Sequence, residues 1–224
     1  MLAGASLLAA TGVTPASAGA PSVARILRRA RNDMLAAGSV HLVVQVRGAR
    51  QSTIVADIGR AAGRETYRSG SAMVTVLITA TAAYVGGNAT GLRTLVGLTP
   101  AQVRRVGRRF VEMRAGTSQY SGFAANLTVV ALAGLLPHGG GITARTTGTG
   151  SVLLSWKSTS RASGAASSQM TLAVGTRVLP TLEVVRSAAG GGSTHFSRWG
   201  RPVVVEAPPA GRTIADSAVS GSPA

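Results

Sequence analysis

The chain has 224 residues, which suits a single domain of ordinary size, and its aromatic content of 4% means that a core must be built mainly from aliphatic side chains. The net charge of +16 is spread along the chain, which favours attraction to an anionic membrane surface over binding of nucleic acid. The absence of cysteine excludes disulfides, thiol nucleophiles, cysteine metal sites and a lipid-modified N-terminal cysteine.

The first 18 residues have the features of a secretory signal peptide. An apolar stretch over residues 2–13 is followed by the helix breaker Pro15 and by the A-x-A cleavage site Ala16-Ser17-Ala18. No Lys or Arg precedes the apolar stretch, and a buried N-terminal helix is the alternative interpretation. We predict cleavage after Ala18 and export to the periplasm, the cell envelope or the medium, without an anchor on cysteine.

A helix followed by a β-meander is predicted next. Over residues 21–37, apolar side chains recur at intervals of three, four and seven, and Gly38 stands where a helix C-cap belongs. Residues 39–47 then alternate strictly between apolar and polar, which is typical of a half-buried strand. The same alternation over residues 51–60, followed by a turn and residues 64–68, continues an antiparallel meander.

The middle of the chain combines strands with helices. Strands are predicted over residues 71–79, 82–85 and 109–114. Between them, Asn88 or Thr90 can cap one short helix, and Thr99-Pro100 opens another, with proline at the first helical position.

The most apolar helix is predicted over residues 120–136, where large aliphatic and aromatic side chains follow a helical period up to Pro137. The glycines that follow leave its end free to move. We therefore expect this helix to act as a lid, with Leu127, Val130 and Leu135 facing a cavity.

The last third of the chain returns to strands. They are predicted over residues 142–147, 151–158, 169–174, 179–186, 193–198 and 202–206. Residues 209–224 lack periodicity and are rich in Ala, Ser, Gly and Pro, so they are predicted to form a flexible tail. The pattern as a whole predicts an α+β domain over residues 19–208, with a large curved antiparallel sheet. This sheet would be a half-barrel of about ten strands, with helices covering its concave face.

Apolar residues on the presumed concave face are candidates for lining a cavity that binds an apolar ligand. They come from alternating positions of the strands and from the helices, and they are Val40, Leu42, Val44, Ile54, Val76, Ile78, Leu92, Leu95, Leu127, Val130, Leu135, Leu154 and Leu172. The same side chains would equally fill a closed core. The sequence leaves both possibilities open.

The sequence contains no convincing catalytic, cofactor or metal motif. His138-Gly139-Gly140-Gly141 matches the oxyanion loop of some esterases, but these enzymes also need a G-x-S-x-G nucleophile elbow, which does not occur. The three histidines lack the spacing of a metal site, and the glycine clusters lack a phosphate-binding lysine. We predict a non-enzymatic protein without a cofactor. A hydrolase remains an option only if folding brings a histidine and an acidic residue to a serine in one cleft.

Several short motifs occur in the order found in a known family. They are Ser39-Val40-His41-Leu42, Ala83-Tyr84-Val85, Arg109-Phe110-Val111-Glu112, Leu179-Pro180 and Phe196-Ser197-Arg198-Trp199-Gly200-Arg201-Pro202-Val203-Val204-Val205. Over about residues 22–208, the chain resembles the actinobacterial envelope proteins related to LprG and LppX, whose fold is shared with the lipoprotein carriers LolA and LolB.

The resemblance implies a half-barrel whose concave face holds acyl chains beneath covering helices. Many members carry a cysteine just after the signal peptide, and this sequence has none, so a freely diffusing form is expected. The predicted function is that of an exported envelope protein that binds or carries a phospholipid or an acylated glycolipid, as a monomer. The alternative is a protein-interaction or sensor domain on the same scaffold, without a bound lipid.

Overall fold

The computed structural model describes residues 22–48, 51–138, 140–148, 150–160 and 164–220. The predicted signal peptide lies outside these described residues. No helix within them has the length and the apolar character needed to cross a bilayer.

Helix α1 (Val23–Ala37) ends where the sequence pattern predicts and begins two residues later than predicted. The Ser22 side chain caps it by accepting a hydrogen bond from the amide of Arg25, and Gly38 ends it in the left-handed region at φ 73°. Its buried stripe includes Met34, which is 1% exposed. The apolar periodicity of this segment therefore serves to attach the helix to the rest of the domain.

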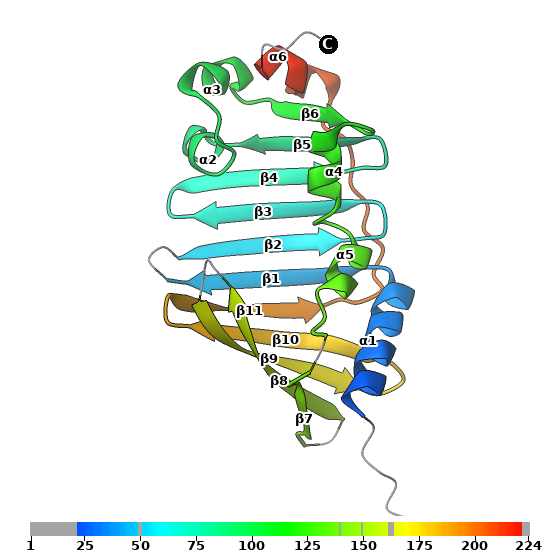
Figure 1. Cartoon of the computed structure of the whole chain (residues 1–224). Helices are drawn as coiled ribbons and strands as arrows, with labels where there is room; N and C mark the ends of the chain where they lie inside the picture. The colour runs from blue at the N-terminus through cyan, green and yellow to red at the C-terminus, as the bar shows by residue number, and fades with distance from the viewer. Residues whose placement is uncertain (1–21, 49–50, 139, 149, 161–163, 221–224) are drawn as a thin grey trace, which may run out of the picture.

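Twelve strands of the described residues form one sheet (Figure 1). They are β1 (Val40–Arg47), β2 (Ser52–Ile58), β3 (Gly63–Ser69), β4 (Ala72–Ile78), β5 (Ala82–Gly87), β6 (Phe110–Arg114), β7 (Thr143–Thr146), β8 (Ser151–Ser160), β9 (Gly164–Val174), β10 (Val178–Ser187), β11 (Gly190–Ser197) and β12 (Thr213–Ala215). Across the sheet the order is β12-β6-β5-β4-β3-β2-β1-β11-β10-β9-β8-β7. Two meanders, β1 to β6 and β7 to β11, are thus joined where β1 pairs with β11.

Alternation along the strands gives the sheet two different faces. We call the face that carries Leu42 and Val44 of β1 the inner face, and the face that carries His41 and Val43 the outer face. The register extends each face from strand to strand, so that Leu42 lies opposite Ala56 of β2 on the inner side. The inner face holds most of the buried aliphatic side chains of the strands.

Two short helices, α4 (Ser118–Ala124) and α5 (Val129–Gly134), lie over one end of the inner face (Figure 1). The single continuous helix predicted over residues 120–136 is wrong.

The break between α4 and α5 has a tertiary cause. Thr128 caps α5 through its side chain, and the amide of Val129 donates to the carbonyl oxygen of Gly59 at 3.1 Å. This contact with the sheet draws the chain inward, and Leu127 is 3% exposed as a result. The apolar period of the segment reflects attachment to the core and not one uninterrupted helix.

The two helices predicted between β5 and β6 are confirmed as α2 (Ala89–Thr94) and α3 (Pro100–Val106). The Asn88 side chain caps α2, and Thr99 forms a reciprocal capping box with Gln102 at the start of α3. Both helices lie at the end of the sheet that carries β4 to β6 (Figure 1).

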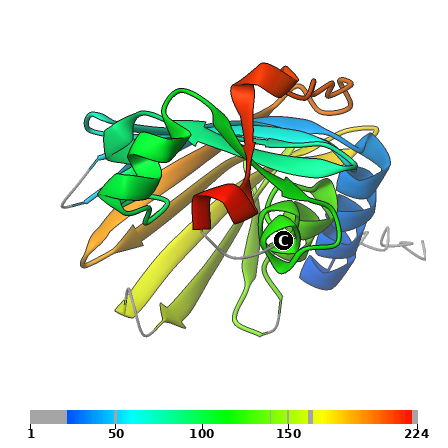
Figure 2. The ribbon, with the colours of Figure 1, turned by 90° about the horizontal axis from the view of Figure 1, so that it is seen from above.

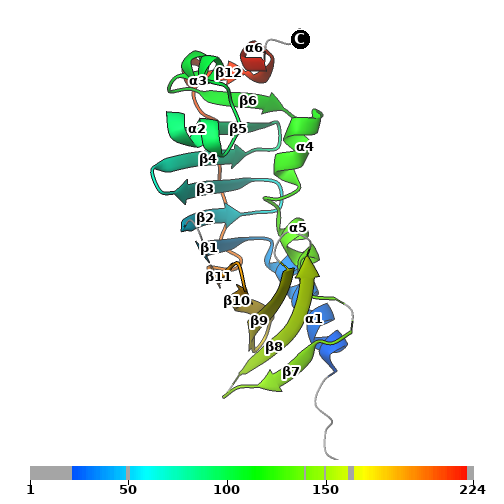
Figure 3. The ribbon, with the colours of Figure 1, turned by 60° about the vertical axis from the view of Figure 1, so that its left-hand side comes forward.

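The predicted fold class is confirmed: the protein is α+β with one large sheet, although the described strands number twelve and not about ten. The sheet is open and only weakly curved, and β7 to β9 bend toward the side on which α1 lies (Figure 3). Its core divides into three clusters. One lies under α4 and α5, one lies between α1 and β8 to β10, and one surrounds α2, α3 and β6.

The end of the chain differs from the prediction. Residues 202–206 form no strand and instead cross the sheet on the side away from α4 and α5, before the short helical turn η1 (Ala210–Arg212) (Figure 2). After this turn, β12 pairs with β6 in parallel and α6 (Asp216–Ser220) follows. The predicted flexible tail is therefore wrong for residues 210–220. The reason is apolar burial, because Val219 is 3% exposed in the third cluster.

Candidate functional site

A groove of about 470 Å³ lies on the inner face, at the ends of β1, β10 and β11. Its lining includes Val44, Val46, Glu183, Val185 and Thr194. Helices α4 and α5 cross the opposite ends of the strands, so they leave this part of the inner face uncovered (Figure 1). The groove is the place where the apolar side of the sheet meets solvent.

The register extends the groove toward β3 and β4. Val44 lies opposite Ile54 of β2, Ile54 lies opposite Tyr67 of β3, and Tyr67 lies opposite Val74 of β4. Neighbouring strands are about 4.8 Å apart, so the first three side chains form a continuous apolar strip. All three are half-buried, whereas Val74 is buried. Such a strip can take up the apolar part of a ligand without unpacking the core.

Two carboxyl groups stand on the same apolar face. Burial raises the pKa of Glu183, which lies opposite Met170 and Thr194, and burial likewise raises the pKa of Glu65, which lies opposite Ala56. Among the described residues, neither carboxylate has an ion-pair partner. Each ionised group therefore opposes further loss of water from its surroundings.

The thirteen residues predicted to line a cavity do not meet in one pocket. Eight of them are buried in the three clusters of the core, and they are Val40, Leu42, Val76, Ile78, Leu92, Leu127, Leu154 and Leu172. Val44 lines the groove, and Ile54 belongs to the strip beside it. Leu95, Val130 and Leu135 are exposed, at 39%, 66% and 77%. The strand residues share the inner face as the alternation predicts, but most of them pack against protein.

A second hollow, of about 580 Å³, lies between α1 and the chain that follows α5. Its apolar lining includes Leu27, Leu136 and Ile142, and Arg28 and Arg31 of α1 line it as well. Sequence reasoning did not place a site here. The one feature of the sequence that could have indicated this hollow is the pair of arginines beside the apolar stripe of α1. The apolar residues that complete the lining come from a segment more than 100 residues further along the chain.

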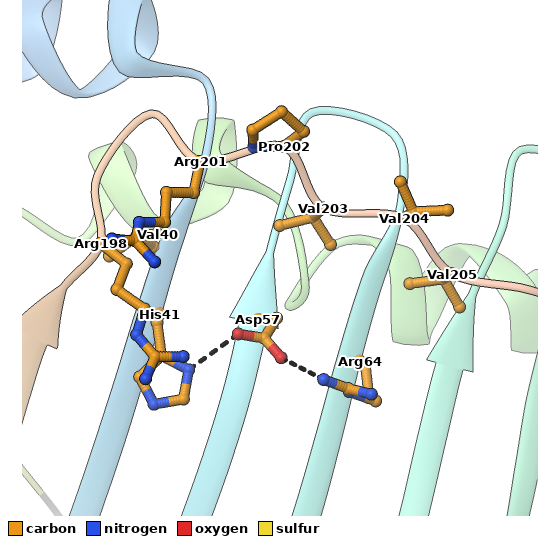
Figure 4. A pocket seen from close by; sticks show the side chains of 10 residues that line it. All are labelled: Val40, His41, Asp57, Arg64, Arg198, Arg201, Pro202, Val203, Val204 and Val205. Carbon is orange, nitrogen blue, oxygen red and sulfur yellow. Dashed lines mark hydrogen bonds and ion pairs between the residues drawn. The ribbon is translucent and has the colours of Figure 1, made fainter.

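The outer face carries a polar cluster that the sequence did not predict. His41, Asp57 and Arg64 occupy directly opposite positions on β1, β2 and β3 (Figure 4). The imidazole Nδ1 of His41 lies 2.7 Å from Oδ1 of Asp57, and a guanidinium nitrogen of Arg64 donates to Oδ2 at 2.6 Å. Ser197 lies opposite His41 on β11. A serine nucleophile needs a hydrogen bond to its base, and none joins Ser197 to His41 in this described cluster.

Burial acts on the Asp57 carboxyl by raising its pKa, but this effect is outweighed by the hydrogen bonds and charges of Arg64 and His41, so that the pKa lies below its ordinary value. Asp57 is therefore ionised at neutral pH. Both of its oxygens already have partners, which makes it a fixed anchor for the two side chains beside it.

Comparisons with known proteins return solved structures only, since no family model and no curated protein matches the chain. LprF from Mycobacterium bovis is 16% identical over 85% of this chain and 99% of its own, with a TM-score of 0.47. The lipoprotein LppX from Mycobacterium tuberculosis is 14% identical over 83% of this chain and 100% of its own, with a TM-score of 0.43. An uncharacterized conserved protein from Thermus thermophilus is 12% identical over 87% of this chain and 99% of its own, also with a TM-score of 0.43. LppX, one of the two proteins that name the group the sequence resembles, is thus among the matched structures.

Proposed function

We propose that the protein is an exported envelope protein that binds a lipid or another acylated amphiphile in the groove of the inner face. The observation that carries the proposal is the strip of Val44, Ile54 and Tyr67, which belongs to the apolar side of the sheet and yet is only half-buried. Among the described helices, α4 and α5 cover the opposite ends of these strands. A soluble domain that leaves such a strip open gains by covering it with an apolar ligand. The export part of the proposal rests on the signal peptide predicted over the first 18 residues.

The groove is large enough to bind part of an acyl chain. Burying about ten methylene groups contributes roughly 8 kcal/mol before the costs of association, at about 0.8 kcal/mol each. A dissociation constant in the micromolar range corresponds to about 8 kcal/mol after those costs are met, so more than ten methylene groups must be buried to reach it. The remainder of a long chain would have to lie along the strip from Val44 to Tyr67.

The charges around the groove suit an amphiphile with an anionic head group. Arg47 stands at the end of β1 among the residues that line the groove, but its side chain starts from the outer face, so its guanidinium can meet a phosphate or carboxylate only at the rim of the groove. Binding of this kind requires no catalytic group. We accordingly propose that the protein is not an enzyme.

A second candidate function is an interaction or sensor domain without a bound lipid. It is favoured by Val130 in α5 and by Leu135 at the C-cap of this helix, which are exposed although they are large and apolar. Such side chains can contact a partner protein. This candidate differs from the first in requiring no ligand in the groove.

Uptake of a fluorescent acyl probe by the purified chain tests the lipid proposal. We expect saturable binding with one or two probes per protein, displaced by an unlabelled phospholipid, and native mass spectrometry should detect the bound lipid. Protein that stays free of lipid and takes up no probe would contradict the proposal and favour the interaction domain.

Probe binding should depend on pH through Glu183. A tail in the groove would bury this carboxyl further, so binding favours its neutral form, and affinity should fall as the pH rises above the raised pKa of the free protein. E183Q should bind more tightly than the wild type at pH 7 and should lose this pH dependence. Titrations of both proteins with an uncharged acyl probe, from about pH 4 to pH 8, measure the effect.

The same substitution should change stability with a defined sign. Because the pKa of Glu183 is raised in the folded state, the folded protein holds its proton more tightly than the unfolded chain does, and stability is lost as the pH rises through the raised pKa. E183Q should therefore be more stable than the wild type at neutral pH, by about 1 kcal/mol, and equal to it near pH 4. Equal stability of the two proteins at both pH values would refute this assignment.

A further inference from the structure

A second pocket lies on the outer face, beneath the segment that crosses the sheet after β11. It has a volume of about 230 Å³. Its floor contains the side chains of His41, Asp57 and Arg64, and its other side contains Arg198, Arg201 and the valines that follow them (Figure 4). Because outer and inner positions alternate along each strand, this pocket and the groove lie on opposite sides of the sheet.

The floor of the pocket is held rigidly. Asp57 fixes His41 through one carboxylate oxygen and Arg64 through the other, at 2.7 and 2.6 Å. All three residues project from paired strands, whose backbone hydrogen bonds set their spacing. The remaining ring nitrogen of His41 and the free donors of Arg64 are therefore oriented before any ligand arrives.

The crossing segment is anchored beside the floor. The Ser39 hydroxyl donates to the carbonyl oxygen of Arg201 at 2.5 Å, and the amide of Gly200 donates to the carbonyl oxygen of Ser39 at 3.0 Å. Arg198 has φ 54°, and it is the one residue other than glycine with a positive φ in the described part of the chain. An arginine in the left-handed region costs free energy that a glycine would not, and such strain is concentrated at functional sites.

The charges in the pocket do not balance. Three guanidinium groups and one imidazole face a single carboxylate, and that carboxylate is already fully paired. Within the described residues, the side chains of Arg198 and Arg201 form no hydrogen bond or ion pair, and both residues are exposed. Guanidinium groups bind phosphate and carboxylate oxygens with charge-assisted, often bidentate, hydrogen bonds.

We propose that this outer-face pocket binds an oxyanion, a phosphate or carboxylate group that Arg198 and Arg201 hold against His41 and Arg64. The volume fits a single head group, and Val203 offers an apolar contact for the atoms attached to it. This site is independent of the groove and does not rest on the proposed function. Its anion comes either from a free small molecule or from an anionic lipid at a membrane surface.

Titration of the full chain with inorganic phosphate tests the site, with the side-chain NMR signals of His41 as readout. A parallel arm measures binding to phosphatidylglycerol vesicles, with phosphatidylcholine vesicles as reference. The test variant R198G/R201Q removes both free guanidinium groups, and the first change also relieves the positive φ. The matched control R68Q/R186Q removes the same charge from exposed arginines elsewhere on the outer face.

We expect the wild type and R68Q/R186Q to bind alike and R198G/R201Q to bind at least about tenfold more weakly. Phosphate binding identifies a free anion as sufficient, and binding to phosphatidylglycerol vesicles alone identifies the lipid head group. If phosphate does not shift the His41 signals and phosphatidylglycerol vesicles bind no better than phosphatidylcholine vesicles, or if the control loses as much affinity as the test variant, the proposal is overturned.

Thermal unfolding and acyl-probe uptake are also measured for both double variants. Uptake in the groove should be unchanged in R198G/R201Q, which separates failure of this site from failure of the proposed function. If R198G/R201Q unfolds, R201Q alone carries the same test, because it leaves the turn at Arg198 intact.

Discussion

Replacing Leu127 by arginine should destabilise the protein by at least about 4 kcal/mol and lower its melting temperature by roughly 10 °C or more. Leu127 is 3% exposed between α4 and α5 and packs in the cluster under these helices. The substitution removes a buried aliphatic side chain and places a charge among apolar neighbours, where no carboxylate pairs with it. Urea and thermal unfolding measure the loss.

V130R is the matched control for L127R, since Val130 lies three residues further along the chain and is 66% exposed. It should change the free energy of unfolding by no more than about 0.5 kcal/mol. It should also leave acyl-probe uptake unchanged, because α5 does not cover the groove. A marked loss of uptake in a stable V130R protein would restore the idea that this segment is a lid.

Replacing Val44 by arginine should reduce acyl-probe affinity about 100-fold or more. The change removes roughly 1.5 kcal/mol of apolar contact with the ligand and requires a guanidinium to lose water beneath an acyl chain, which costs several kcal/mol more. The fold should tolerate it, because Val44 is half-buried and Glu183 lies two strands away on the same face. Equilibrium titration with the fluorescent probe measures the change.

Q45R provides the comparison for V44R. Gln45 is the next residue of β1, is exposed, and projects from the outer face, so this substitution adds the same charge on the other side of the sheet. Its probe affinity should stay within a factor of about two of the wild type. Equal losses in V44R and Q45R would mean that added charge, and not occupation of the groove, reduces binding.

The strand pattern could be predicted from the sequence because it is local. Alternation along β1 and β2 placed Leu42, Val44 and Ile54 on one face, and the register confirms that they share it. The caps at Asn88 and Thr99 are likewise local, since each side chain accepts a hydrogen bond from the amide three residues along the chain. Such features need no knowledge of the rest of the fold.

The parts that escaped prediction depend on distant partners. The break before α5 results from a contact between Val129 and Gly59, 70 positions apart. The ordered C-terminal segment results from pairing of β12 with β6, and the cluster on the outer face unites His41 with Arg64 through strand register. For the groove, alternation identified the face, but only the positions of α4 and α5 determine which apolar residues on it are left uncovered.

The pairing of β1 with β11 also governs how the protein can be made. Ser197 lies opposite His41, so the first strand of the sheet receives its second neighbour only after roughly 150 further residues have been synthesised. Until then, a chain that emerges N-terminus first has an unpaired β1 edge next to an apolar surface, which is the kind of intermediate that aggregates. Ribosomal pausing or slow translocation within the second meander would prolong that exposure. The yield of folded protein in an export host should therefore rise with the supply of chaperones that bind unfolded chains. This dependence should be stronger than the stability of the folded protein alone would suggest.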